Sequence, residues 1–567
     1  MIMGDVLEYL VDGTSGLAPG GVDGSAIICG VCSKGEVGKG YLIGKSSDLA
    51  SMLGVGTLVD RVKDALLTAG QEATLIAVPC QGNAGGYISE PRITGKSPAC
   101  KVLGSPQKNA LVVMQVETEG QIGTAAVKLS FDGGKNFGSA LQSSKTIPLR
   151  SDEMQTGATL VFADETENLT LGTKYEITVR TSISDVSKIG SEESPDITVT
   201  GEVKAAAELM LVIEKAGSLN EATYKLSVDG GDTFMKTRTV PIDGTYELLD
   251  YGVTITFPEG SYEGGTTYLC SLLAPEPSIT SVMEALEKPL SLYDIEFVHV
   301  AAASNSIDWA AAGAKADELW NMHRPTYFKM EARLPYAGED LNDYTAALLE
   351  EKQKFSHRFV QVIAQFGEVT ETGGNRHFRN FGGLNSGRTM SIPVQRAAGR
   401  VRDGGISGVS LVDGWEAVQP VLEEAGFVTA KKYAGLDGVY WADSRTMADD
   451  TSDFRYEEVL RTTFKAVRLM RVAALKSMYD EAGDVLLGEN ALGLSYLKAN
   501  IENALDTMVK AIPQELAGYV VNIPNGQDIV NNGVAVETTL IGIPIIRQIK
   551  LYTNYAYAGS NFDPRMQ

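Results

Sequence analysis

The stretch KLSFDGGKNF, residues 128–137, returns as KLSVDGGDTF at residues 225–234, an offset of 97 positions. Further on, GATLVF (157–162) corresponds to GVTITF (252–257), and the offset shrinks to 95. Loops tolerate such differences in length better than the elements that they connect. The chain therefore contains two copies of one structural unit.

Each copy has the pattern of a small all-β domain. Runs such as ALVVMQVET (110–118) and YEITVRT (175–181) alternate apolar and polar residues, as half-buried strands do. The shared Asp-Gly-Gly is typical of a tight turn, because glycine adopts positive φ without strain. We expect two tandem β-sandwich modules, at residues 93–196 and 197–275.

The chain after the repeat alternates strands and helices. Strands are expected in DIEFVHV (294–300), PTYFKME (325–331) and FVQVIAQF (359–366). Helices are expected between them, near 307–322 and 341–355. This order predicts a largely parallel sheet covered by helices.

The chain before the repeat has the same character. SAIICGVC (25–32) and ATLIAVP (73–79) read as strands on either side of a helix over 58–69. We therefore predict a single α/β core with a mixed, largely parallel sheet, flanking helices and terminal strands. Its halves are residues 1–92 and 276–567, and the two β modules interrupt it.

The amino-acid composition of the chain limits the kinds of molecule that it is expected to bind. The chain has 49 Lys and Arg against 72 Asp and Glu, a net charge of −23, which argues against a nucleic-acid partner. No apolar run approaches the ~18 residues of a membrane span. The first residues also lack the basic and apolar regions of a secretory signal. We expect no membrane anchor.

The motifs that could indicate nucleotide binding, redox chemistry or metal binding do not have the residue spacing that these functions require. GEVGKGYLIGKS (35–46) ends like a phosphate-binding loop, but Lys39 stands where the first glycine is required. Cys29 and Cys32 form a CxxC within a predicted strand, where residues three apart face opposite sides. The four histidines have no metal-ligand spacing. We predict a protein that is not an enzyme and has no cofactor and no metal site.

The order of motifs resembles the contractile tail sheath proteins of myovirus-type bacteriophages. At the start, the strand over 26–32 leads through Lys34-Gly35 and a short strand to SSDL (46–49). Later, GLDGVYWADSRTMADDTSDFRYEEVLRTTFKAVRLMRVAALKSM (435–478) resembles the sheath segment in which a strand and loop enter a long helix. The resemblance covers about two thirds of the chain, and the β modules correspond to variable outward insertions of that family.

The resemblance implies a structural role. Such subunits stack as hexameric rings around a tail tube, and their contraction drives the tube through the host envelope. The implied partners are further copies, the tail tube protein, and baseplate and tail terminator proteins. The implied location is the virion tail, after assembly in the cytoplasm of the host bacterium.

Other functions remain open at this point. The same core would serve a tail-like bacteriocin or another contractile injection system. A multidomain surface adhesin would also carry β modules, although usually at one end of the chain. An enzyme would need a convergent site, which the motifs do not provide.

The terminal segments are candidate subunit interfaces, because sheath subunits are linked by arms that add a strand to a neighbour's sheet. IRQIKLYTNYAYA (546–558) is rich in β-branched and aromatic residues. It could instead be an internal strand of its own domain. VLEYLVDG (6–13) is the N-terminal candidate. The predicted interface residues are Ile546, Gln548, Ile549, Leu551, Tyr552, Tyr555, Tyr557, Leu7 and Tyr9.

A helix predicted over 454–479 carries a basic stripe. Arg461, Lys465 and Arg468 follow one another at i, i+4 and i+7, which places them on one face. In a chain this acidic, the stripe is predicted to face an acidic tail tube. The alternative is an ordinary solvated helix face.

Overall fold

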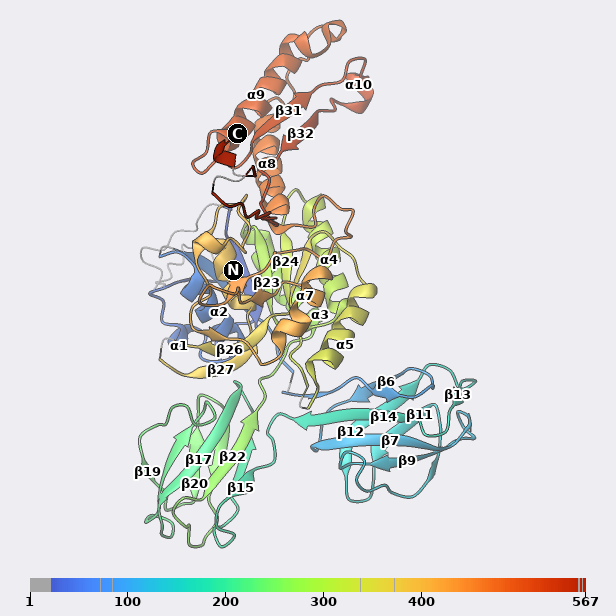
Figure 1. Ribbon diagram of the computed structural model, residues 1–567, viewed down its shortest axis with the longest axis vertical. Coiled ribbons are helices and arrows are strands. Elements are labelled where there is room, and N and C mark those ends of the chain that lie inside the picture. The colour runs from blue at the N-terminus through green and yellow to red at the C-terminus, as the bar shows by residue number, and fades with distance from the viewer. Residues whose placement is uncertain are drawn as a thin grey trace, which may run out of the picture. The chain divides into compact units, whose positions relative to one another are not determined.

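The computed structural model describes residues 22–558 except 72, 84, 337 and 372, and also residues 561–562 and 564–566 (Figure 1). The chain divides into two compact units, one ending at Arg468 and the other beginning at Leu469. The first unit holds the central sheet and most of the strands. The second unit holds the end of one long helix, a second long helix and a small sheet.

The central sheet joins the two flanks of the repeat. Within the described residues its strand order is β2-β3-β1-β23-β24-β25. β1 lies parallel to β23, with Ala26 opposite Phe297, and only β2 is antiparallel to its neighbour. The strands are β1 (Ala26–Gly30), β2 (Tyr41–Gly44), β3 (Thr74–Pro79), β23 (Phe297–Ser304), β24 (Tyr327–Ala332) and β25 (Val360–Ile363). The fold is mixed α/β.

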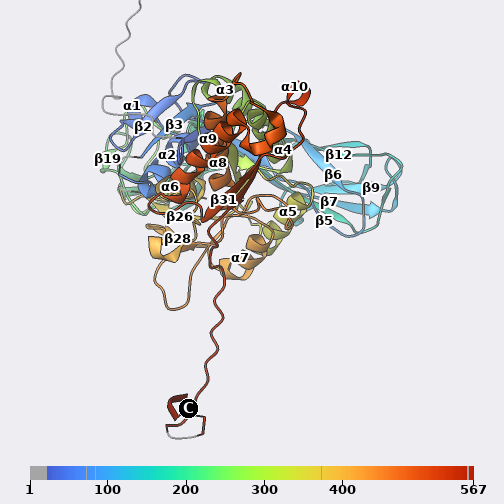
Figure 2. The ribbon, with the colours of Figure 1, turned by 90° about the horizontal axis from the view of Figure 1, so that it is seen from above.

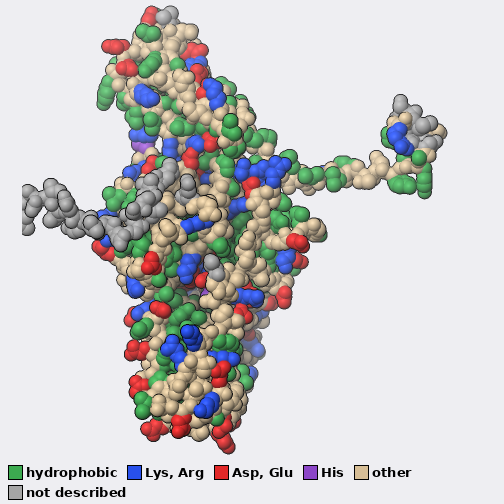
Figure 3. All heavy atoms as spheres, turned by 90° about the vertical axis from the view of Figure 1, so that its left-hand side faces the viewer, with side chains coloured by type: hydrophobic (Ala, Val, Ile, Leu, Met, Phe, Trp, Pro, Cys, Tyr) green, Lys and Arg blue, Asp and Glu red, His purple; other side chains and the backbone are tan. Residues whose placement is uncertain are grey.

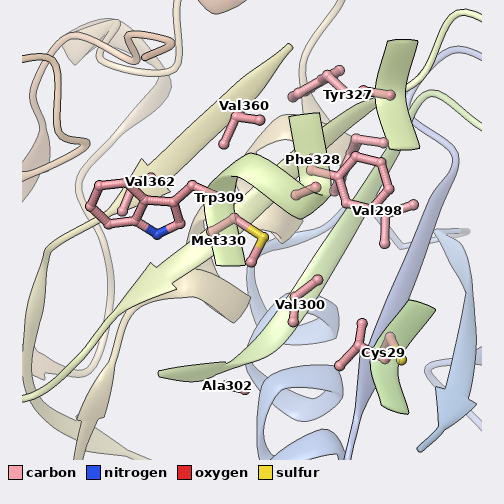
Figure 4. Close-up of a cluster of buried hydrophobic side chains, with 14 of the residues drawn as sticks. Cys29, Val298, Val300, Ala302, Trp309, Tyr327, Phe328, Met330, Val360 and Val362 are labelled. Carbon is pink, nitrogen blue, oxygen red and sulfur yellow. The ribbon is translucent and has the colours of Figure 1, made fainter. Parts of the chain in front are cut away.

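Helices cover both faces of this sheet, because its strands are apolar on both sides. Val298 and Val300 of β23 and Met330 of β24 share one cluster with Trp309 (Figure 4). A second cluster joins Ile28 to the apolar face of α2. The helices of the first unit are α1 (Leu49–Met52), α2 (Thr57–Thr68), α3 (Ile279–Leu292), α4 (Ser306–Asn321), α5 (Leu341–Gln353), α6 (Gly382–Ser391) and α7 (Trp415–Glu424), and the 3-10 helix η1 is Val401–Asp403.

The strand predicted over 359–366 is wrong as a single element. β25 ends at Ile363, and β26 begins at Phe366 in another sheet. Gln365 between them is buried, and its side-chain oxygen accepts a hydrogen bond from the N–H of Ala430, at 2.6 Å, which fixes the bend. The smaller strands here are β26 (Phe366–Thr370), β27 (Arg376–Asn380), β28 (Val409–Ser410), β29 (Ala430–Lys431) and β30 (Tyr440–Trp441).

The first copy of the repeat lies in residues 86–181, called β region 1. It forms antiparallel sheets around a hydrophobic cluster of its own. β4 and β5 pair with β14, so this region begins ahead of residue 93. Its strands are β4 (Gly86–Ile88), β5 (Arg92–Thr94), β6 (Cys100–Gly104), β7 (Ala110–Thr118), β8 (Gly120–Gln121), β9 (Ala126–Ser130), β10 (Leu141–Gln142), β11 (Thr146–Arg150), β12 (Gln155–Phe162), β13 (Asn168–Leu169) and β14 (Lys174–Thr181).

The second copy lies in residues 187–272, called β region 2, again with a cluster of its own. β15 pairs with β22 and so lies in this region, ahead of the boundary predicted at residue 197. A three-residue strand carries too little periodicity to be assigned from sequence. The strands are β15 (Ser187–Ile189), β16 (Thr198–Gly201), β17 (Ala207–Lys215), β18 (Thr223–Ser227), β19 (Arg238–Thr239), β20 (Thr245–Leu248), β21 (Val253–Thr256) and β22 (Thr267–Leu272).

The repeated sequence forms the same loop in both regions. Ser130 donates to Asp132 at 2.6 Å, and Ser227 donates to Asp229 at the same distance. Both aspartates also accept a backbone N–H from four residues further along the chain. The repeated aspartate is therefore explained by hydrogen bonds within its own turn.

The second unit continues from α8, a single helix that begins in the first unit. The buried apolar residues of α9 lie on one side of α9 itself. β31 and β32 form an antiparallel pair. Among the described residues, no helix is both long and apolar enough to cross a lipid bilayer. The elements are α8 (Glu457–Leu475), η2 (Val485–Asn490), α9 (Leu492–Val509), β31 (Gly518–Asn522), α10 (Ile529–Asn532), β32 (Glu537–Ile541) and η3 (Pro564–Met566).

Candidate assembly interface

The C-terminal segment is extended and exposed. Residues 542–557 belong to no helix or strand, so the strand expected at 546–558 is absent from the isolated chain (Figure 2). A β-strand needs a neighbouring strand to complete its backbone hydrogen bonds, and no strand among the described residues pairs with residues 542–557. The structure thereby disfavours an internal strand of the chain's own domain.

Apolar side chains concentrate on this segment, called the C-terminal arm (542–558) (Figure 3). The predicted interface side chains Ile546, Ile549, Leu551, Tyr552, Tyr555 and Tyr557 are 74–86% exposed, and Gln548 is exposed as well. Contiguous exposed apolar residues on this scale mark an interaction surface. Leu7 and Tyr9 lie outside the described residues.

The small sheet of the second unit has open edges. Within the described residues, β31 and β32 pair with each other and with no other strand. A two-stranded sheet is marginally stable in water, and its free backbone groups can pair with a further strand. An extended apolar arm and an unsaturated sheet thus occur in the same unit.

The prediction of an exposed basic stripe is wrong for Arg461. Its side chain is 1% exposed, and its Nε lies 2.7 Å from Oε1 of Glu296. A second hydrogen bond joins Nη2 to Oε2 of Glu296 at 3.1 Å. The burial of both charges in a bidentate pair leaves Arg461 unable to face a tube.

The other two stripe residues also point into the first unit. Lys465 lies 2.7 Å from Asp23 and is partly buried. Arg468 donates to the backbone oxygen of Ile295 at 3.0 Å and to that of Pro325. The stripe therefore attaches α8 to the central core.

A second buried pair joins α8 to the sheet. Glu457 lies 2.8 Å from the Lys329 ammonium and accepts the hydroxyl of Tyr327 at the same distance. Burial alone would raise the pKa of Glu457, but the charges of Lys329 and Arg461 and the hydrogen bonds from Lys329 and Tyr327 together outweigh it and lower that pKa to about 2. Glu457 is therefore ionised at neutral pH.

A third buried group joins the two flanks of the repeat. Arg61 of α2 contacts Glu331 of β24 through Nε at 2.5 Å, and His299 of β23 lies 3.0 Å from the same carboxylate oxygen. Burial lowers the pKa of His299, so the ring is neutral at neutral pH. Sequence reasoning missed these pairs, because the partners lie far apart in the chain.

The buried charged groups described above are arranged as ion pairs that join separate elements of the fold. Each carboxylate is matched by a guanidinium or ammonium group within the packed core. Among the described residues, no group of three or more His, Cys, Asp or Glu side chains could hold a metal ion. Cys29 is buried and Cys32 only partly so, and both are free thiols. At 35–46, no helix opens at Lys45-Ser46; α1 begins at Leu49.

Together these features define a multidomain α/β protein with several sheets and an exposed arm. The chain belongs to the DUF2586 family: the DUF2586 N-terminal domain matches residues 3–445, and the DUF2586 C-terminal domain matches residues 453–560. No curated protein matches the chain.

Several solved structures are similar to the chain. One is a sheath tail protein from Desulfitobacterium hafniense, with 12% identity and a TM-score of 0.40, covering 95% of this chain and 100% of that one. A sheath tail protein from Listeria innocua has 9% identity and a TM-score of 0.38, covering 94% and 97%. The contracted sheath of an extracellular contractile injection system, PVC, has 16% identity and a TM-score of 0.37, covering 54% and 78%.

Proposed function

We propose that this chain is the structural subunit of a contractile sheath, which polymerises around a tail tube and drives the tube through a cell envelope when it contracts. The observation that carries the proposal is the exposed apolar C-terminal arm in a unit whose small sheet has open edges. The sequence resemblance supports the same function. A phage tail, a tail-like bacteriocin and another contractile injection system would each use such a subunit.

The arm suits a contact between copies. Added as a strand to the β31–β32 sheet of a neighbour, it would gain backbone hydrogen bonds and bury its apolar side chains. The donating and accepting surfaces differ, so the contact is heterologous and can repeat without closing. The proposed partners are thus further copies, a tube protein, and baseplate and terminator proteins, within a virion tail or an equivalent machine.

The purified full-length chain should form hollow tubes. Polymerisation should set in above a threshold concentration, because each subunit is held by several neighbours. Negative-stain electron microscopy and sedimentation measure this directly. A small oligomer of fixed size at every concentration would instead favour an enzyme or a binding protein and would contradict the sheath.

We also propose that the two β regions are tandem β-sandwich modules inserted into the core and projecting outward from the polymer. Each has a hydrophobic cluster of its own. The N–H of Asn83 donates to the backbone oxygen of Glu276 at 2.9 Å, and Gly82 bridges Pro277. The chain thus leaves and re-enters the core at neighbouring residues.

Deletion of residues 84–275, with a short Gly/Ser linker between Asn83 and Glu276, should leave a folded subunit that still forms tubes. The linker spans two backbones that are already hydrogen-bonded, so it imposes little strain. Circular dichroism and negative stain are the measurements. A matched deletion of residues 74–275 also removes β3 from the sheet and should not fold. If the first deletion is unfolded or strictly monomeric, the insertion proposal is wrong.

A further inference from the structure

A basic segment runs from the last turn of α6, through the loop that follows it, to the 3-10 helix η1. Residues 388–403, called the arginine loop, contain Arg388, Arg396, Arg400 and Arg402 but one acid, Asp403, for a net charge of 4 − 1 = +3. In a chain of net charge −23, this is a local reversal of sign. Such a reversal attracts an acidic surface.

The arginine loop is held in shape from within. Arg388 donates to the backbone oxygens of Ala398 at 3.1 Å, Asp403 at 3.0 Å and Arg400 at 3.2 Å. Its guanidinium therefore occupies the inside of the loop. The side chains of Arg396 and Arg400 are 26% and 36% exposed, and Arg402 is exposed. A loop that is already ordered loses little entropy when it binds.

The segment of the chain that connects α8 to α9 is acidic, opposite in charge to the arginine loop. Residues 477–490, called the hairpin tip, contain Asp480, Glu481, Asp484 and Glu489 and no basic residue, for a net charge of −4. Tyr479 in the same segment is 100% exposed. Its φ is +66°, a left-handed conformation that is strained for an aromatic residue. Such strain is kept where function needs it.

We propose that the hairpin tip of one copy docks on the arginine loop of a second copy. This inference rests on the proposed sheath function and names a contact within the polymer. Tyr479 supplies an aromatic anchor, and exposed Val401 supplies apolar surface on the loop. Charged residues surround both, as in the polar rim of an interface. The charges of +3 and −4 are complementary.

The choice of a second copy follows from the charge of the whole chain. Two copies of net charge −23 repel each other in most orientations. A docking pair of opposite sign favours one orientation and disfavours the rest. Because the two patches are different, each copy can donate its tip to one neighbour and receive the tip of another.

The direct test is photo-crosslinking of the full-length chain. A ¹⁵N-labelled chain with p-benzoylphenylalanine in place of Tyr479 is mixed with unlabelled wild-type chain, irradiated and digested. Peptides from residues 388–403 that carry ¹⁴N should be the main products. Products confined to the labelled chain would mean an intramolecular contact, and products elsewhere would mean another surface. Either result overturns the proposal.

Charge reversal gives the second readout. The loop variant carries Arg396→Glu, Arg400→Glu and Arg402→Glu and keeps Arg388, which shapes the loop. The tip variant carries Asp480→Lys and Glu481→Lys and keeps Asp484, which caps η2. Each should raise the concentration needed for polymerisation about tenfold, because the loop variant has a loop of net charge −3 that repels the acidic tip, and the tip variant has a tip of net charge 0 that no longer attracts the loop.

A mixture of the two variants should polymerise at a lower concentration than either variant alone, because the unchanged acidic tip of the loop variant can dock on the unchanged basic loop of the tip variant. An intramolecular contact would not be rescued by mixing. The control variant Lys101→Glu, Lys135→Glu, Arg150→Glu changes the net charge as much as the loop variant does, at exposed sites in β region 1, and should stay within twofold of wild type. Thresholds equal to wild type in both patch variants would overturn the proposal. Absence of tubes from the wild type would contradict the sheath function, whereas the crosslink still decides the contact.

Discussion

Removal of residues 546–567 should yield a folded, soluble subunit that no longer forms tubes. The deleted segment contains the exposed apolar side chains of the C-terminal arm. It contributes no helix or strand over 546–557, so its loss should leave the remaining fold intact. Polymerisation should fall below detection by sedimentation and negative stain.

A finer version of this experiment changes one backbone group at a time. Proline at Ile549 or Leu551 removes an N–H that a strand pairing would use and should also prevent assembly. The matched variants Ile549→Val and Leu551→Val keep the N–H and a high strand propensity, and should assemble. Normal tubes from the truncated chain would show that the arm does not link subunits.

Arg461→Ala should lower the free energy of unfolding of the first unit by about 3–5 kcal/mol, because Glu296 would remain as a buried charge without its partner. Both side chains are 1% exposed, so water cannot replace the lost contact. Denaturant unfolding at a concentration below polymerisation gives this value. The effect is large against the marginal stability of folded domains.

Two further variants separate the ion pair from general effects on α8. Arg471→Ala changes an exposed arginine of the same helix and should alter stability by less than about 0.5 kcal/mol. The double variant Arg461→Met, Glu296→Gln removes both charges and should recover at least half of the loss. A loss below about 0.5 kcal/mol for Arg461→Ala would contradict a stabilising role of this pair.

The sequence predicted the elements of the core well, because their signals are local. The helix expected at 341–355 is α5 (Leu341–Gln353), and the strand expected at 294–300 overlaps β23 (Phe297–Ser304). Each has a clear hydrophobic pattern over a single element. The order of these elements also predicted the mixed α/β class.

Contacts between distant segments could not be predicted in this way. The spacing of Arg461, Lys465 and Arg468 correctly indicates proximity along one side of a helix, but gives no sign of what that side meets. Glu296 lies 165 positions earlier than Arg461, within a run that reads as an apolar strand. The strand expected at 546–558 is absent for a related reason. Its composition favours a strand, but a strand forms only where it pairs with a partner edge, and no strand among the described residues pairs with it.

The hydrogen bond between Asn83 and Glu276 has a consequence for how such a chain can change. A folded insert whose two ends lie side by side adds almost no closure cost to its host, whatever its internal length. The position can therefore accept a duplicated, exchanged or foreign domain while the surrounding sheet stays the same. Two related copies in tandem are what growth at one permissive site would leave behind. In the proposed polymer, the same junction would give engineers a place to display a chosen domain many times along one filament.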